Sequence, residues 1–148
     1  MSMPNIKPSD KIAVGAVLDP VSQAAATVTT GWVSMQVAEN LLAILQVGAF
    51  GASATVDAKL QQASDSTGTG AKDITGKAIT QMVAAGGNNK QIMINVRSEE
   101  LDVTNAFCFV RLSVTVGTAA TLISALLLQL DGRYQPIAQP ASVTQTIS

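Results

Sequence analysis

The chain has 148 residues, a formal net charge of −1, 13% charged residues, one cysteine and no histidine. This length fits a single domain with one adequate core, and the absence of a strong basic charge removes the main source of nucleic-acid affinity. Without histidine, the chain lacks the commonest general base and the commonest transition-metal ligand, and a single cysteine excludes an intrachain disulfide. We therefore expect no enzymatic activity, no cofactor, no bound metal and no nucleic-acid partner.

Hydrophobic residues make up 47% of the chain but aromatic residues only 3%, so the core must consist of Val, Ile, Leu and Ala. Charged residues are about half as frequent as the ~25% of average proteins. A polar but nearly uncharged surface suits a protein that packs against other copies of itself or against a partner.

No apolar segment typical of a signal peptide is present at the start of the sequence. The longest nearly apolar run, Leu122 to Leu130, is about half the ~20 residues that a membrane helix needs. We therefore expect a soluble protein made in the cytoplasm of its host, with no membrane partner.

The first residues, 1–11, are polar and contain two prolines, which predict an extended N-terminal arm because proline blocks ladder hydrogen bonds. Residues 12–18 form a first strand that Asp19-Pro20 closes. Residues 22–30 are ambiguous, and a loop leading into a strand near Val28 is one interpretation.

A short strand is expected at residues 31–35, around the only tryptophan, Trp32. We expect Trp32 to fill the core or seal the edge of the fold rather than to form a ligand platform, because no second aromatic is near it in sequence. After a turn or a single helical turn at Ala38-Glu39-Asn40, the apolar run at residues 41–47 predicts a buried strand. A helix over residues 37–47 is the competing interpretation; we prefer the strand because glycines end the run after a length typical of strands.

The segment 54–81 predicts a strand, a flexible turn and a second strand. Val56, Ala58 and Leu60 alternate with polar residues, which gives one dry and one wet face. Turn-forming residues occupy 64–70, and a more polar strand follows at residues 73–80.

The second half of the chain alternates strands with turns. Strands are expected at residues 91–97, 107–116 and 121–130, and the last of these, being the most hydrophobic, is expected to be central. Cys108 falls in an apolar strand pattern and is interpreted as a small core residue. About eight short strands with glycine-rich turns predict an all-β fold, an antiparallel β-sandwich or jelly roll. We divide the chain into an extended N-terminal arm (1–11), the sandwich domain (12–134) and an extended C-terminal tail (135–148).

Three short segments resemble known catalytic or ligand-binding motifs, but none has the residues or the spacing that the motif requires. A phosphate-binding loop needs four residues between its glycines and a hydroxyl after its lysine, but five residues separate Gly70 from Gly76, and Ala78 follows Lys77. The sequence around Asp65 is not the Asp-Thr-Gly of aspartic proteases. The acidic residues 99–102 match no calcium loop and are interpreted as a solvated turn. Arg111 is expected on the wet face or paired with a carboxylate such as Asp57 or Asp102.

Four sequence stretches together resemble a known family: VDAKLQQA (56–63), GAKDITGKAI (70–79), INVRSEELD (94–102) and FVRLSVTV (109–116). The chain is similar, over roughly residues 5–137, to small virion proteins encoded in the head-gene clusters of tailed phages and prophages, which are associated with capsid decoration (cement) roles. The motifs are family markers and not active-site motifs, so no catalytic residue follows from them.

The resemblance implies a structural protein that binds the outside of a tailed-phage capsid and stabilises it, located in the virion. Its partners would be the major capsid protein and itself, as a homo-oligomer, with a trimer expected. The candidate contact residues of the arm and tail are Met3, Pro4, Ile6, Lys7, Pro8, Tyr134, Pro136, Ile137, Pro140 and Val143, and those of a candidate contact loop are Asp65, Ser66, Thr67 and Gly68.

Two other functions remain open at this point. A head–tail connector or tail-terminator subunit would form a ring and would also be structural. A β-sandwich carbohydrate-binding module used in adhesion would stack sugar rings on aromatic side chains, of which the chain has few.

Overall fold

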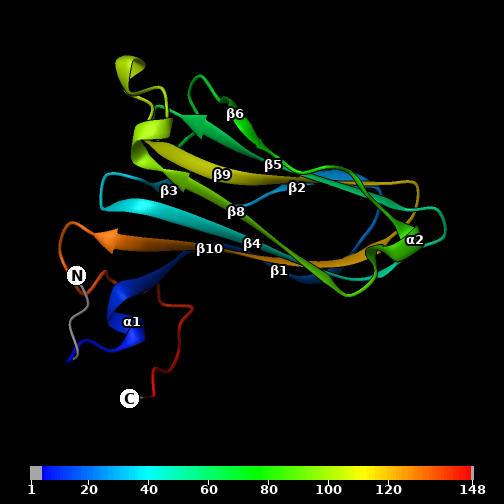
Figure 1. The fold of residues 1–148 in the computed structure, drawn as a ribbon, viewed down its shortest axis with the longest axis horizontal. Helices are drawn as coiled ribbons and strands as arrows, with labels where there is room; N and C mark the ends of the chain where they lie inside the picture. The colour runs from blue at the N-terminus through cyan, green and yellow to red at the C-terminus, as the bar shows by residue number, and fades with distance from the viewer. Residues whose placement is uncertain (1–4, 148) are drawn as a thin grey trace.

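Two antiparallel sheets face each other in the computed structural model, which describes residues 5–147 (Figure 1). Sheet A has the strand order β1-β10-β4-β8, with bounds Ile12–Gln23, Thr121–Gly132, Ala38–Phe50 and Lys90–Arg97. Sheet B has the order β2-β9-β5-β6, with bounds Ala26–Thr29, Phe109–Gly117, Thr55–Ala63 and Lys72–Ala78. Two short strands complete sheet B: β3 (Val33–Ser34) pairs with β9, and β7 (Met82–Val83) pairs with β5. The predicted fold class, an antiparallel β-sandwich, is confirmed.

Helical structure is limited to single turns. The elements are α1 (Pro8–Lys11), α2 (Ala84–Gly87), and the 3-10 turns η1 (Ser98–Glu100) and η2 (Val103–Asn105). None of the helices within residues 5–147 has the length and apolar character needed to cross a membrane.

The core lies between the two sheets and is aliphatic. On β9, alternate residues Val110, Leu112 and Val114 are fully buried, and on β5 the same holds for Val56 and Leu60. Successive side chains of a strand point to opposite faces, so this spacing places one face of each strand in the core. The dry face predicted for the 54–81 segment is therefore confirmed.

Strand β10 is central in sheet A, as its hydrophobicity predicts. It pairs with β1 from Ile12↔Leu130 onward and with β4 through pairs such as Leu126↔Ile44. Because β4 is hydrogen-bonded to strands on both sides, the competing helix over residues 37–47 is excluded. The turn predicted at Ala38-Glu39-Asn40 is wrong, because β4 begins at Ala38, where pairing with Gly132 of β10 keeps the backbone extended.

Strand β1 continues past Asp19-Pro20, where the sequence predicts its end. The pairing register with β10 shifts between Leu18 and Val21, so the proline sits in a bulge. Strand β1 is an edge of sheet A, and at an edge or bulge the missing N–H of proline costs no ladder hydrogen bond. The ambiguous segment 22–30 contains the end of β1 and then β2, in agreement with a strand near Val28.

The predicted N-terminal arm is not extended throughout. Pro8 opens the single turn of α1, a position that suits proline because its fixed φ matches a helix start and its missing N–H would have no partner there. Residues 133–147 contain no helix or strand. The C-terminal tail returns to the sandwich, where Ile137 packs against Ala13 and Ala38.

The tail also blocks the open edge of β1. The amide side chain of Gln139 accepts a hydrogen bond from the N–H of Val14 at 3.1 Å and donates to the carbonyl of Ile12 at 2.6 Å. It also donates to the carbonyl of Ser9 in α1. One side chain thus provides the bonds that another strand would make, and it joins the tail to the N-terminal segment.

Replacing Leu127, which is fully buried at the centre of β10, tests the assignment of this strand. We expect Leu127→Ala to lower the free energy of unfolding by about 2–5 kcal/mol, because it leaves a cavity between the sheets. The control Ser124→Ala lies on the outward face of the same strand and should change it by less than about 0.5 kcal/mol. Urea denaturation measures both; similar losses for the two variants would contradict the assigned faces.

Candidate functional site

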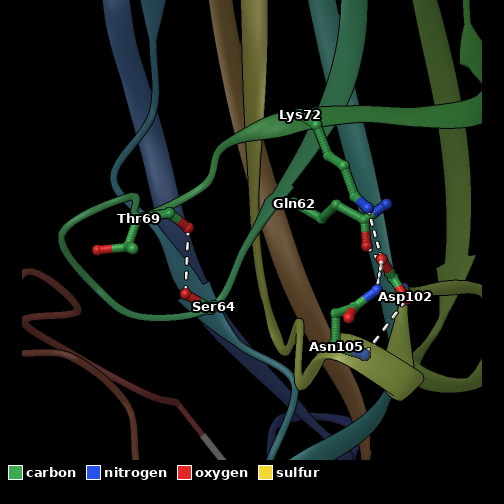
Figure 2. Close-up of polar contacts among 6 residues, drawn as sticks. All are labelled: Gln62, Ser64, Thr69, Lys72, Asp102 and Asn105. Carbon is green, nitrogen blue, oxygen red and sulfur yellow. Dashed lines mark hydrogen bonds and ion pairs between the residues drawn. The ribbon is translucent and has the colours of Figure 1, made fainter.

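The loop between β5 and β6 is ordered by its own aspartate. One oxygen of Asp65 accepts hydrogen bonds from the Thr67 hydroxyl at 2.6 Å, the Thr67 N–H at 2.9 Å and the Thr69 N–H at 3.1 Å. These bonds, that of the Thr67 hydroxyl first, hold the pKa of Asp65 well below its usual range. Ser64 closes the loop through its N–H and hydroxyl, which both donate to the Thr69 carbonyl (Figure 2). The segment predicted as a flexible turn is therefore a hydrogen-bonded one.

The same loop packs against two aromatic rings. Gly68 and Gly70 have positive φ angles of 90° and 69°. A Cβ on Gly68 would stand 2.9 Å from the indole nitrogen of Trp32, and one on Gly70 would stand 3.2 Å from the ring of Phe107. Both positions therefore need glycine for its backbone conformation and for the close approach of a ring.

Polar side chains on the outward face of sheet B form a continuous chain. Lys59 pairs with Asp73 at 2.9 Å, Gln61 donates to Asp73 at 3.0 Å, and Arg111 donates to Gln61 at 2.9 Å. The guanidinium of Arg111 then lies 4.5 Å from the centre of the Trp32 ring. The Lys59 hydrogen bond, more than the Gln61 bond, keeps the pKa of Asp73 below its ordinary value.

Arg111 is on the wet face, one of the two predicted placements, but the suggested partners Asp57 and Asp102 are wrong. Gln61 lies directly opposite Arg111 in the β5–β9 register, which brings the two side chains together. Asp57 instead accepts a hydrogen bond from Gln81, and Asp102 pairs with Lys72.

Asp102 connects β5, β6 and the η2 turn through hydrogen bonds to one residue of each. Figure 2 shows Gln62, Lys72 and Asn105 around it. Its carboxylate accepts from the ammonium of Lys72 and the side-chain amide of Asn105, and its N–H donates to Gln62. The Lys72 bond is the main reason that the pKa of Asp102 is lowered. The Lys72 ammonium also lies 4.4 Å from the centre of the Phe107 ring, so the loop and this pair form one surface.

The acidic cluster at residues 99–102 is divided among separate cations. Glu99 pairs with Arg97, Glu100 with Lys77 and Asp102 with Lys72. Among residues 5–147, no three His, Cys, Asp or Glu side chains are placed to hold a metal ion together. The carboxylates thus act as pairing groups for the surface of the sandwich.

Trp32 and Cys108 occupy positions next to the loop. Trp32 is half-buried, with Arg111 over its ring and Gly68 against its nitrogen edge, so the ring is not an open platform. Cys108 was predicted as a core residue within a strand, but it is half-buried and precedes β9. Its thiol faces the carbonyl of Ser64 at 3.8 Å, and its backbone is held on both sides, because its N–H donates to Ala63 and its carbonyl accepts from Met35.

The candidate arm and tail residues lie at one end of the sandwich but differ in exposure. Met3 and Pro4 lie outside the described residues. Tyr134 is 89% exposed, whereas Ile137 is buried in its own domain and cannot serve as a partner contact. The others fall into an exposed group, Lys7, Pro8 and Pro136, and a half-buried group, Ile6, Pro140 and Val143.

Sequence reasoning missed a second surface, which we name the sheet A outer face. It consists of the outward apolar side chains of all four strands: Ile12, Val14, Val17, Leu42, Ile44, Met93, Leu122, Leu126, Leu128 and Leu130. The signal was in the run at 121–130, which is apolar at both alternating sets of positions. In a two-sheet sandwich only one set faces the core, so the other set must face outward.

Comparisons with known proteins give structural likenesses alone. No family model matches the chain, and no curated protein matches it in sequence. A chain in the structure of Broad Bean Stain Virus is 10% identical with a TM-score of 0.47, and the match covers 95% of this chain and 96% of that one. A chain of the cowpea mosaic virus top component, described as naturally occurring empty particles, is 10% identical with a TM-score of 0.42 at the same coverages.

A third likeness is to the CBM22-1–GH10 modules of the Clostridium thermocellum xylanase 10B, complexed with xylohexaose. The identity is 12%, the TM-score is 0.44, and the match covers 87% of this chain and 29% of that one. With TM-scores below 0.5, none of these likenesses supports a particular function.

Acidification tests the role of Asp65. Its pKa is lower in the folded chain than the ordinary value of about 4, so the unfolded chain binds the proton first, and stability falls as pH drops below about 4. Asp65→Asn keeps an acceptor oxygen but does not titrate. We expect its melting temperature to fall less between pH 4 and pH 2 than that of the wild type. The neighbouring Ser66→Ala should match the wild type; an equal fall for Asp65→Asn would contradict the assignment.

The contact between Gly68 and Trp32 has a matched control in Gly76. Both glycines have positive φ, but a Cβ on Gly76 would meet nothing within 4 Å. We expect Gly76→Ala to cost about 1–2 kcal/mol of stability from backbone strain alone, and Gly68→Ala to cost at least about 1 kcal/mol more from overpacking. The fluorescence of Trp32, the only tryptophan, should shift in Gly68→Ala alone. Equal costs and unchanged spectra would contradict the contact.

Proposed function

We propose that this protein is a non-enzymatic structural protein of a tailed-phage virion, which binds the outside of the capsid as a homotrimer and stabilises it. The resemblance of residues 56–63, 70–79, 94–102 and 109–116 to phage head-cluster proteins supports this proposal. The aliphatic sandwich core and the low proportion of charged surface residues fit a rigid body that works through contacts with other proteins.

The observation that carries the proposal is the pairing of the two predicted contact segments. The N-terminal segment with α1 and the C-terminal tail lie beside each other at one end of the sandwich (Figure 1). Gln139 joins them through hydrogen bonds to Ser9 and Ile12. Two segments from opposite ends of the sequence thus form one surface, which we infer to be the capsid-binding end.

Exposed groups at this end are suited to contacts with another protein. Tyr134 is 89% exposed, and the tail continues to Ile147, which is 87% exposed. Tyrosine is enriched in the energetically important parts of interfaces because it brings a large rigid ring and a hydroxyl. Contacts of this kind, repeated over a capsid lattice, add avidity to a weak individual affinity.

The copy number in virions and the accessibility of aromatic rings distinguish the two alternative functions, a ring subunit and a carbohydrate-binding module, from a decoration protein. A connector or tail-terminator subunit would be present in purified virions at the copy number of one ring, and a decoration protein in far more copies. An adhesion module would need an open aromatic ring for a sugar, and the Trp32 ring is engaged by Arg111 and Gly68.

A binding assay with capsids that lack this protein, from the phage that encodes it, tests the proposal. We expect deletion of residues 1–6 or the substitution Tyr134→Ala to weaken capsid binding at least about tenfold, because each removes part of the inferred contact end. Circular dichroism should be unchanged, since Asn5, Ile6 and Tyr134 are not among the buried core residues. The control Ala85→Glu, in α2 at the opposite end of the sandwich (Figure 1), should bind normally. Undiminished binding by both variants would overturn the assigned contact end, and a full-length chain that binds no capsid would overturn the function.

A further inference from the structure

The sheet A outer face is a regular grid of apolar side chains. In one row, Met93 of β8, Ile44 of β4, Leu126 of β10 and Val17 of β1 lie opposite one another across the sheet. The rows on the side of α1 contain Leu42, Leu128 and Val14, and then Leu130 and Ile12. Leu122 lies in the other direction along β10, beyond the polar row in which Ser124 faces Gln46.

This face is exposed to a degree that is unusual for such residues. Met93 is 62% exposed, Leu122 46%, Leu126 41% and Val17 36%. Soluble monomers rarely expose a continuous apolar patch larger than a few hundred Å², and larger patches mark interaction sites. The strands within residues 5–147 form two sheets, and none of them makes a third layer over this one.

Charge is nearly absent from the grid. The polar positions that lie among or beside the apolar ones are neutral, namely Asn40, Gln46, Gln91, Asn95 and Ser124. Charged residues lie at its margins: Arg97 is paired with Glu99 at 2.9 Å, Asp131 accepts a hydrogen bond from Asn40, and Asp19 is exposed in the bulge of β1. The outward face of sheet B is the opposite case, because it carries the ionic chain from Lys59 to Arg111.

The area of the grid can be compared with the area that a stable contact needs. Strands lie about 4.8 Å apart and same-face rows about 6.8 Å apart, so four strands and five rows, polar positions included, cover roughly 650 Å² in projection. A standard interface buries about 800 Å² per partner, with an apolar centre and a polar rim. The apolar grid therefore has the size of the centre, and the neutral Asn and Gln side chains around it fit the rim.

We propose that a second copy of this chain covers the sheet A outer face. A face whose charges lie at its margins meets an identical face with no like charges at the centre of the contact, and a two-fold contact uses the same patch on each copy. A partner that carries charged groups would leave them without partners against this surface, which is costly. The inference rests on the proposed function in that it names the surface through which the homo-oligomer forms. Two copies would stack these faces, and three would turn them toward a common axis.

Sedimentation equilibrium of the full chain tests this inference. We expect the wild type to have the mass of two or three chains at micromolar concentration. We expect Leu126→Lys and Met93→Lys to weaken self-association at least about 100-fold, because each places a charge in the apolar contact. Both side chains point out of the core and are exposed in one copy, so each variant should keep the circular dichroism spectrum and the Trp32 fluorescence of the wild type. The control Thr75→Lys adds the same charge on the exposed surface of β6 and should leave the mass unchanged.

The outcomes separate this inference from the proposed function. A monomeric wild type, or an oligomer that Leu126→Lys and Met93→Lys leave intact, overturns the proposed self-contact, whether or not the chain binds capsids. A monomeric wild type whose capsid binding is lost in Leu126→Lys identifies the capsid protein as the occupant and also overturns it. An oligomer that these variants dissociate supports the self-contact even if no capsid binding is found.

Discussion

The packing of aliphatic side chains between two sheets is the constraint on which the rest of the molecule depends. Each strand gives one of its two faces to this shared core, as Val114 on β9 and Leu127 on β10 do. The other face of every strand is left for a separate purpose. In sheet B, hydrogen bonds and ion pairs occupy it and tie the 64–70 loop to Trp32 and Phe107. In sheet A, it is largely apolar and exposed among the residues that the structure describes, so the two outward faces of one sandwich have opposite chemistry.

Local patterns predicted those parts of the fold that alternate strictly. The strand near residues 55–63 and the one near residues 109–117 were visible because period-2 alternation is a property of the sequence alone. The continuation of β1 through Asp19-Pro20 and the start of β4 at Ala38 were not visible in the sequence. Pairing partners over 90 residues away in the chain keep these segments extended although their residues favour turns. Tertiary context overrides local preference in such places.

The candidate surfaces were predictable to different degrees. Asp65 with its glycines indicated a turn, since these residues favour positive φ and side-chain caps. Its contact with Trp32 was not predictable, because β3 and the loop are brought together by β9 and β5. The N-terminal segment and tail were predicted as contact segments, but nothing in their composition indicated that Gln139 would join them. The run at residues 121–130 contained the apolar face, but a continuous pattern does not say which face stays outside.

The central place of β10 sets the order in which the chain can acquire its structure. Sheet B has its strands within residues 26–117 and can assemble as soon as β9 is made. Sheet A cannot, since β1 has β10 as its one strand neighbour and β10 is the last strand in chain order. Ribosomes add about 5–20 residues per second, so β1 spends several seconds of synthesis without a partner. During that time its bulges and proline have a second use, because they make it a poor template for the strands of other nascent chains.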